Sequence, residues 1–222
     1  MNLHITRHGQ TDVKSDHPPG DPHLTDLGKR QAELLGHALV EQGFNGAVYS
    51  SPYFRTIETA QIVAEVADAV VWPAPPLRDY VIREDQMGGF RGATLAELAA
   101  AYANVRQTSG FPYPWWTTVI ESEEDIEGRV APLVDELASG AADALLVGHG
   151  ASVGGVHRHL LRRYAPERMH YGQIVGWNCC LSSFQLAADF CILRIMDVSH
   201  LPEEAVTSNA KTRDEVLAEC DN

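Results

Sequence analysis

Two histidines stand where an anion could be bound and attacked. His8 follows Arg7 at the end of a short apolar segment, and His149 lies between two glycines at the end of another. A guanidinium offers a planar fork of donors that matches phosphate oxygens, and a neutral imidazole can act as a nucleophile. Two such strand ends indicate one pocket built from both.

Arg55 adds a further cation to this expected pocket. It follows another predicted strand and lies in the first turn of the next predicted helix. A helix N-terminus presents free N–H groups and the positive end of the helix dipole, which both favour an anion. Ligands of open α/β sheets collect outside the carboxyl ends of the strands, so we expect Arg55 to join the two histidines there.

The elements that must position these side chains alternate along the chain, which is typical of an α/β domain. Thr25 is expected to cap the first helix, because its hydroxyl can accept from a free N–H group. The apolar runs predict strands at 3–6, 47–49, 70–72, 144–147, 180–186 and 191–196. The helical patterns predict helices at 26–42, 53–67, 94–105, 123–137 and 152–164.

The helical and strand patterns loosen between residues 77 and 121. This stretch contains a proline- and aromatic-rich run at 110–116. A loop this long within a compact domain is usually functional or disordered, and this one has too many aromatic residues for simple disorder. We expect one domain over 1–222, with 77–121 inserted as a cap and 199–222 as a peripheral tail.

Aromatic side chains of this loop are candidates for a substrate wall that would contact an apolar or ring-bearing group. Trp115 and Trp116 could equally be buried between two copies of the chain. The sequence therefore leaves a homodimer open. The aromatic residues concerned are Phe111, Tyr113, Trp115 and Trp116.

Four motifs follow one another in order along the chain. They are RHGQT at 7–11, LTDLGKRQA at 24–32, SPYFRTIETA at 51–60 and VGHG at 147–150. Together they resemble the histidine phosphatase superfamily, which includes cofactor-dependent phosphoglycerate mutases and related phosphatases, and the likeness extends over about 3–186. It implies a three-layer α/β/α sandwich with a mostly parallel central sheet.

The resemblance also assigns roles to the site residues. His8 would attack phosphorus and form a phosphohistidine, which divides hydrolysis into two displacements. Arg7 and Arg55 would hold the phosphate oxygens, and His149 would donate to the same group as charge develops. Gln10 and Thr11, within the first motif, would also contact the substrate. No metal and no cofactor is implied.

A general acid must protonate the leaving oxygen. By resemblance this role falls on Glu84, which precedes a glycine-containing turn, with Asp79 and Asp85 as rivals. Lys14 stands where the family usually has an asparagine near the phosphate. It either binds a phosphate oxygen or points to water.

The sequence thus predicts a hydrolase of small phosphate monoesters. A phosphoglycerate-mutase-like phosphotransferase is the alternative, but the longer lid segments that would protect its phosphorylated intermediate from water are not recognisable. A catalytically silent binding or scaffold protein on the same fold is a third reading. The intact set of His8, His149, Arg7 and Arg55 argues against it.

Composition limits the other functions. The chain has 222 residues and a formal net charge of −13, which argues against binding nucleic acid through a broad basic face. No stretch is long enough for a membrane span, and no secretory signal is visible, so a cytoplasmic location is expected. His157, His159 and His170 are expected on a solvated helix face rather than at a metal, because neighbouring positions on a helix point apart.

Overall fold

The computed structural model describes residues 1–12, 20–81, 90–173, 176–186, 190–209, 211–212 and 214. Its centre is a six-stranded sheet in the order β3-β2-β4-β1-β5-β6. The first four strands of this order are mutually parallel, whereas β5 and β6 run antiparallel to their neighbours. The strands are β1 (Asn2–Arg7), β2 (Gly46–Ser50), β3 (Val71–Pro73), β4 (Asp143–Gly148), β5 (Leu181–Leu186) and β6 (Phe190–Asp197).

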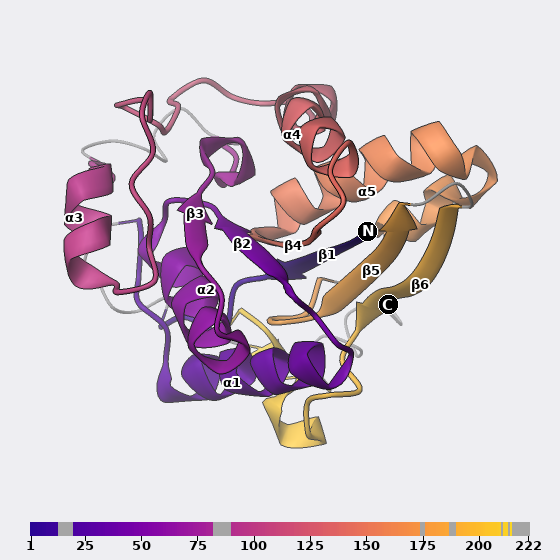
Figure 1. Cartoon of the computed structure of the whole chain (residues 1–222), viewed down its shortest axis with the longest axis horizontal. Coiled ribbons are helices and arrows are strands. Elements are labelled where there is room, and N and C mark those ends of the chain that lie inside the picture. Colours follow the sequence, from indigo (N-terminus) through magenta and orange to yellow (C-terminus); the bar gives the residue numbers. More distant parts are fainter. Residues whose placement is uncertain are drawn as a thin grey trace.

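Helices cover both faces of this sheet, which confirms the predicted α/β fold with a mostly parallel sheet (Figure 1). One face carries α1 (Asp26–Glu41) and α2 (Phe54–Ala67), and the other carries α4 (Glu123–Ala138) and α5 (Gly150–Tyr164). The short α3 (Leu95–Ala101) lies at one end of the molecule. The 3-10 turns are η1 (Pro75–Leu77), η2 (Pro166–Gln173) and η3 (Glu203–Ala205), and β7 (Thr207–Ser208) pairs with β8 (Lys211–Thr212).

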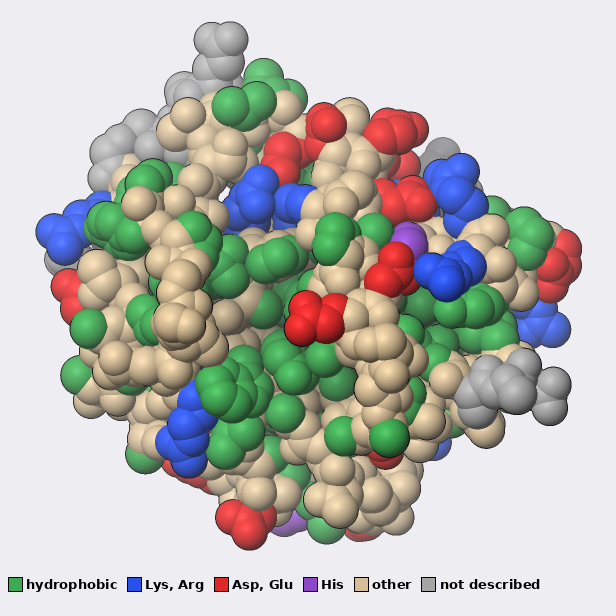
Figure 2. Space-filling model, turned by 45° about the horizontal axis from the view of Figure 1, so that its top comes forward, with side chains coloured by type: hydrophobic (Ala, Val, Ile, Leu, Met, Phe, Trp, Pro, Cys, Tyr) green, Lys and Arg blue, Asp and Glu red, His purple; other side chains and the backbone are tan. Residues whose placement is uncertain are grey.

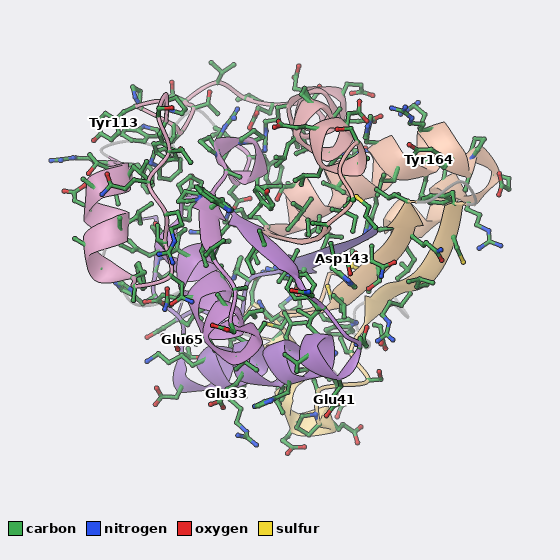
Figure 3. All side chains as sticks on the ribbon, in the orientation of Figure 1. Glu33, Glu41, Glu65, Tyr113, Asp143 and Tyr164 are labelled. Atoms are coloured by element: carbon green, nitrogen blue, oxygen red, sulfur yellow. The ribbon has the colours of Figure 1, made fainter. Side chains whose placement is uncertain are left out.

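Strand β4 shows why the core forms two layers. Its side chains alternate between the faces, as the strand period of two requires. Leu145 and Val147 pack into the layer beneath α1 and α2. Ala144 and Leu146 pack into the layer beneath α4 and α5. At the start of the strand, the carboxylate of Asp143 accepts from the Asn2 amide at 2.6 Å, which ties β4 to β1 (Figure 3).

Helix caps agree with the sequence pattern. The Thr25 hydroxyl accepts from the Gly28 amide at 3.0 Å, as expected for the N-cap of α1. The helix predicted at 94–105, however, ends at Ala101. Beyond it the chain becomes extended and joins the sheet edge, where the amides of Val71 and Arg106 donate at 2.9 and 2.8 Å to carbonyls of the opposite segment. Pairing with β3 thus replaces the last helical turn.

The tail from residue 199 was expected to be peripheral, but its described part packs into the molecule. Leu201, Ala205 and Val206 form a small buried cluster next to α1. The Gln31 side chain of α1 donates to the Ala205 carbonyl at 2.7 Å and to the Thr207 hydroxyl at 2.9 Å. Residues up to 209 therefore belong to the body of the domain.

His157 also departs from its expected solvated position. It is fully buried on α5 and packs edge-on against Phe184, with ring centroids 5.5 Å apart. His159 lies nearer the surface and contacts the Asp135 carboxylate at 2.8 Å. Among the helices that the structure describes, none is long and apolar enough to cross a membrane.

Candidate active site

A cavity of about 560 Å³ lies at the carboxyl ends of β1 and β4. It is lined by Arg7, His8, Arg55 and His149, so the structure brings these four predicted residues together. Asp79 and Asn209 also line it, from segments far away in the sequence. The cavity therefore combines cations, imidazoles and a carboxylate at one edge of the sheet.

Strand register places the two histidines side by side. Arg7 of β1 is paired with Gly148 of β4, and the His8 amide donates to the Gly148 carbonyl at 3.0 Å. Each histidine is the next residue after its pair, so both side chains emerge at the same edge. Their ring centroids are 5.3 Å apart, and both side chains are buried.

The His8 ring is held in one tautomer. Its Nδ1 lies 2.7 Å from the Gly9 carbonyl oxygen, and because a carbonyl only accepts, Nδ1 must carry the hydrogen. In the neutral ring, Nε2 then keeps the lone pair. Burial, reinforced by the nearby charge of Arg55, holds the pKa of His8 well below its ordinary value. The ring is therefore neutral at pH 7.

Backbone contacts around His8 fix its position further. Its carbonyl accepts from the Asn178 side chain at 2.9 Å, and the amide of Gly9 donates to the Thr59 hydroxyl at 3.0 Å. Asn178 in turn accepts from the Thr207 hydroxyl at 3.1 Å. The turn that carries the histidine is thus joined to α2 and to the C-terminal segment.

His149 is the N-cap residue of α5. Its Nε2 lies 2.9 Å from the Ser51 hydroxyl, and the ring packs edge-on against Tyr53 at 5.1 Å. Burial and then the charge of Arg55 hold the pKa of His149 well below its ordinary value. The site therefore contains two neutral imidazoles in the absence of a ligand.

Arg55, in the first turn of α2, lies between two carboxylates. Its Nη1 contacts Asp21 at 3.0 Å and its Nη2 contacts Asp79 at 2.9 Å. The guanidinium also lies over the Tyr53 ring, 4.3 Å from the centroid. Asp21 additionally accepts from the amide of Phe54 at 2.7 Å. These contacts hold the planar donor group at the edge of the cavity.

Arg7 is anchored by the C-terminal part of the chain. Its Nη1 donates to the Gly176 carbonyl at 2.6 Å and to the Ser208 hydroxyl at 3.1 Å, and Nη2 donates to the Asn209 side chain. Asn209 has a left-handed backbone with φ 54°, a conformation that asparagine tolerates. The tail therefore orients one of the two arginines that line the cavity.

The remaining predicted site residues lie in different places. Thr11 lines the cavity. The Gln10 side chain instead accepts from the Thr25 hydroxyl at 2.9 Å, at the start of α1, and Gln10 is not among the lining residues. Lys14 and Glu84 lie outside the described residues, as does Asp85. Of the three candidate acids, the described residues include Asp79, and it lines the cavity.

The aromatic residues of the loop were expected to form a wall of the cavity, but none of them is among its lining residues. Trp115 is only 3% exposed, and its indole donates to the Ala93 carbonyl at 2.8 Å. Trp115 and Trp116 line a second cavity of about 510 Å³ together with Arg78 and Arg129. Figure 2 shows basic side chains next to apolar ones on this side of the molecule. Tyr113 is 49% exposed at the outer edge (Figure 3).

Several residues of the site were not predicted from the sequence. Asp21 and Asn209 have no local pattern that marks them, because their partners are Arg55 and Arg7, far away in sequence. Ser51 belongs to a recognised motif, but only the fold places its hydroxyl on His149. Among the described residues, no group of three or more potential ligands is arranged to hold a metal ion.

Comparisons with known proteins agree with this geometry. A family model of the histidine phosphatase superfamily (branch 1) matches residues 3–197. The 2,3-bisphosphoglycerate-dependent phosphoglycerate mutase of Zymomonas mobilis is 33% identical over 104 residues, which span 45% of this chain and 45% of that enzyme. The glucosyl-3-phosphoglycerate phosphatase of Mycolicibacterium vanbaalenii is 29% identical over 171 residues, 72% of this chain and 73% of that protein.

A solved structure shares the fold. The ecdysone phosphate phosphatase of Bombix mori, crystallised with tungstate, superposes with a TM-score of 0.68 at 19% identity, covering 97% of this chain and 99% of that one. At this identity the likeness concerns the fold alone. The family model, in contrast, spans most of the chain and includes both strand-end histidines. The chain belongs to the histidine phosphatase superfamily.

Proposed function

We propose that the protein hydrolyses phosphate monoesters of small metabolites through a phosphohistidine at His8. The observation that carries this proposal is the hydrogen bond from His8 Nδ1 to the Gly9 carbonyl at 2.7 Å. It leaves the Nε2 lone pair of a neutral ring available in a cavity lined by Arg7 and Arg55. A nucleophile, two cations and a second imidazole are the groups that phosphoryl transfer requires.

The reaction proceeds in two displacements. The Nε2 lone pair of His8 forms a bond to phosphorus while the bond to the ester oxygen breaks, and the leaving oxygen takes a proton. Arg7, Arg55 and His149 bind the phosphoryl oxygens as negative charge shifts among them. Water then attacks the phosphohistidine and releases inorganic phosphate.

Asp79 is the best candidate for the general acid. Its carboxylate lines the cavity and lies 2.9 Å from Arg55 and 3.4 Å from Nδ1 of His149. A group within reach of the bound phosphate can protonate the ester oxygen as it leaves. Glu84, the acid expected from the sequence, lies outside the described residues. Asp79 is the candidate acid that the structure describes in the cavity lining.

Hydrolysis is favoured over transfer of the phosphoryl group between two hydroxyl oxygens. The glucosyl-3-phosphoglycerate phosphatase from Mycolicibacterium vanbaalenii, which aligns with 72% of this chain, supports hydrolysis. A probable phosphoglycerate mutase from Yersinia pestis aligns with 93% of the chain at 27% identity, so the mutase remains the alternative. The lining groups beyond the phosphate site include Thr11, Tyr80 and Asn209. Their hydroxyl and amide groups suit a polar leaving group better than the ring-bearing one that the aromatic loop suggested.

We also propose a cytoplasmic location, which rests on the state of two cysteines. Cys179 and Cys180 are buried free thiols, and burial raises the pKa of Cys180 to about 11. Unpaired, inert thiols are common in reducing compartments. They support a cytoplasmic location.

A metal-free screen of phosphorylated metabolites tests the proposed reaction. We expect release of inorganic phosphate, an acid-labile phosphoenzyme, and loss of both in His8→Ala. His157→Asn is the matched control, since it alters a buried histidine outside the cavity and should leave the phosphoenzyme unchanged. Isomer exchange of phosphoglycerate without phosphate release would favour a mutase. Turnover that persists in His8→Ala would contradict the mechanism.

A further inference from the structure

The carboxylate of Asp79 binds Arg55 and lies next to His149, two groups that a phosphate would contact. Its Oδ2 atom lies 2.9 Å from Nη2 of Arg55 and 3.4 Å from Nδ1 of His149. Nδ1 of His149 makes no hydrogen bond within the described part of the chain. One carboxylate oxygen thus lies between a guanidinium and an imidazole that both line the catalytic cavity. In the ligand-free protein, Asp79 occupies the position of an anionic oxygen.

Asp21, the second carboxylate on Arg55, differs in its environment. Its side chain is 3% exposed, compared with 30% for Asp79. Asp21 also accepts from the Phe54 amide at 2.7 Å, which fixes it at the N-terminus of α2. Asp21 is therefore a permanent partner of Arg55, whereas Asp79 can exchange with an anion that enters from solvent.

The charges around Asp79 determine what this exchange does to its protonation. Both site histidines are neutral, so the charges of Arg7 and Arg55 are opposed by those of Asp79 and of Asp21, whose pKa burial raises to about 6. A dianion added to this site would lie beside the negative charge of Asp79, and like charges at such distances favour protonation of a carboxylate. The charged and titratable groups around Asp79 come from several elements. They are Arg7 at the end of β1, His8 after it, Arg55 of α2, Arg129 of α4, His149 at the N-cap of α5, and Asp21, Tyr53, Arg78 and Tyr80 of the connecting segments.

We propose that Asp79 is an exchangeable internal occupant of the phosphate site, and that an incoming dianion replaces it on Arg55 and His149 while the released carboxylate takes up one proton from solvent. This inference rests on the proposed function, because it concerns the same phosphate site. Substrate binding itself then protonates the general acid.

The protons balance over the catalytic cycle. The proton taken up at binding passes to the leaving oxygen when the phosphohistidine forms, which returns Asp79 to the carboxylate. In the second displacement a proton from the attacking water returns to Asp79, and the hydroxide bonds to phosphorus. When inorganic phosphate leaves, Asp79 releases this proton and binds Arg55 again. An arginine of the phosphate site is thus never left without an anionic partner.

Calorimetric titration with sulfate tests the exchange. Sulfate is a dianion that does not titrate near neutral pH, so any proton taken up when it binds must be bound by the protein. Titrations in two buffers of different ionisation enthalpy count these protons. For the wild type we expect close to one proton per sulfate, and a sulfate Kd that rises with pH by up to about tenfold per pH unit. Zero uptake by the wild type would overturn the inference without any variant.

Two substitutions locate the proton. Asp79→Asn should bind sulfate at least as tightly as the wild type, with no proton uptake and a pH-independent Kd. Asp26→Asn, at a fully exposed carboxyl of α1, is the matched control and should keep the uptake. Uptake that persists in Asp79→Asn would place the proton on Asp21, whose pKa burial raises to about 6, or on His8 or His149, and would refute the exchange.

Failure of the inference can be distinguished from failure of the proposed function. If sulfate binds and inhibits turnover competitively but without proton uptake, the phosphate site is supported and the exchange is wrong. If sulfate does not bind to the wild type and no phosphoester is hydrolysed, the proposed function itself fails, together with the exchange.

Discussion

Gly28 of α1 lies directly against the backbone of Gln10. A Cβ atom on Gly28 would lie 2.1 Å from the Gln10 carbonyl oxygen, much closer than any non-bonded contact allows. Gly9 is equally confined, since a Cβ there would lie 2.5 Å from the Gly28 carbonyl. The first helix and the turn that carries His8 therefore pack backbone against backbone, and two glycines of separate motifs serve one contact.

Gly28→Ala tests this contact. Relief of the clash must move either α1 or the turn after β1, so we expect a loss of about 1–3 kcal/mol in the free energy of unfolding and a fall in kcat/KM. Gly128→Ala in α4 is the control, because a Cβ there meets nothing within 4 Å. Alanine should stabilise that helix by about 0.5–1 kcal/mol. Denaturant unfolding measures both, and equal effects would contradict the packing argument.

Arg55→Lys should impair catalysis more than folding. A lysine ammonium is a compact point charge, so it cannot contact Asp21 and a phosphate in the fork geometry of the guanidinium. We expect kcat/KM to fall by about 10²–10³-fold, with a small change in melting temperature. Arg30→Lys, at an exposed position of α1, is the control. Wild-type activity in Arg55→Lys would remove Arg55 from the phosphate site.

The pH dependence of kcat/KM should lack an acid limb at the ordinary histidine pKa of 6.5. The pKa of His8 lies well below that value, chiefly because of burial. The nucleophile therefore stays neutral as pH falls through 6.5, and its protonation removes activity only at more acid pH. Pre-steady-state formation of the phosphoenzyme, followed with an ester whose own phosphate does not titrate in this range, measures this limb. An acid limb at pH 6.5 that persists with such a substrate would contradict a buried, neutral His8.

His157 should make the protein less stable in mild acid. Burial lowers the pKa of His157 to about 4, so between pH 6.5 and about 4 the unfolded chain binds a proton that the folded chain does not. Stability from this group is therefore present above pH 6.5 and falls as the pH decreases, by about 2 kcal/mol between pH 7 and pH 5. His157→Leu should remove this part of the loss.

Denaturant unfolding of wild type and His157→Leu at both pH values provides the measurement. The comparison depends on the difference between pH values, so a change in packing that acts equally at both pH values cancels. His159→Gln is a suitable control because His159 lies near the surface, against Asp135. An identical pH dependence in wild type and His157→Leu would show that His157 does not stay neutral in the folded protein.

Local patterns in the sequence were sufficient for most of the scaffold. Alternating apolar runs placed the strands, and Thr25 marked the start of α1 correctly. The pattern failed where distant pairing overrides local preference: residues 102–105 were predicted as helix but lie beside β3. It failed likewise for the described tail and for His157, whose burial depends on what packs against them rather than on neighbours in sequence.

The sequence by itself determined which residue types meet at the candidate site, because its two histidines and two arginines stand in short ordered motifs at predicted strand ends. Only the tertiary structure decided how that chemistry is arranged. The bond from His8 to Gly9, the two carboxylates on Arg55 and the Asn209 contact with Arg7 all depend on geometry. The last two join segments that lie apart in the chain, and no periodicity encodes such contacts, because packing of separate elements brings them together.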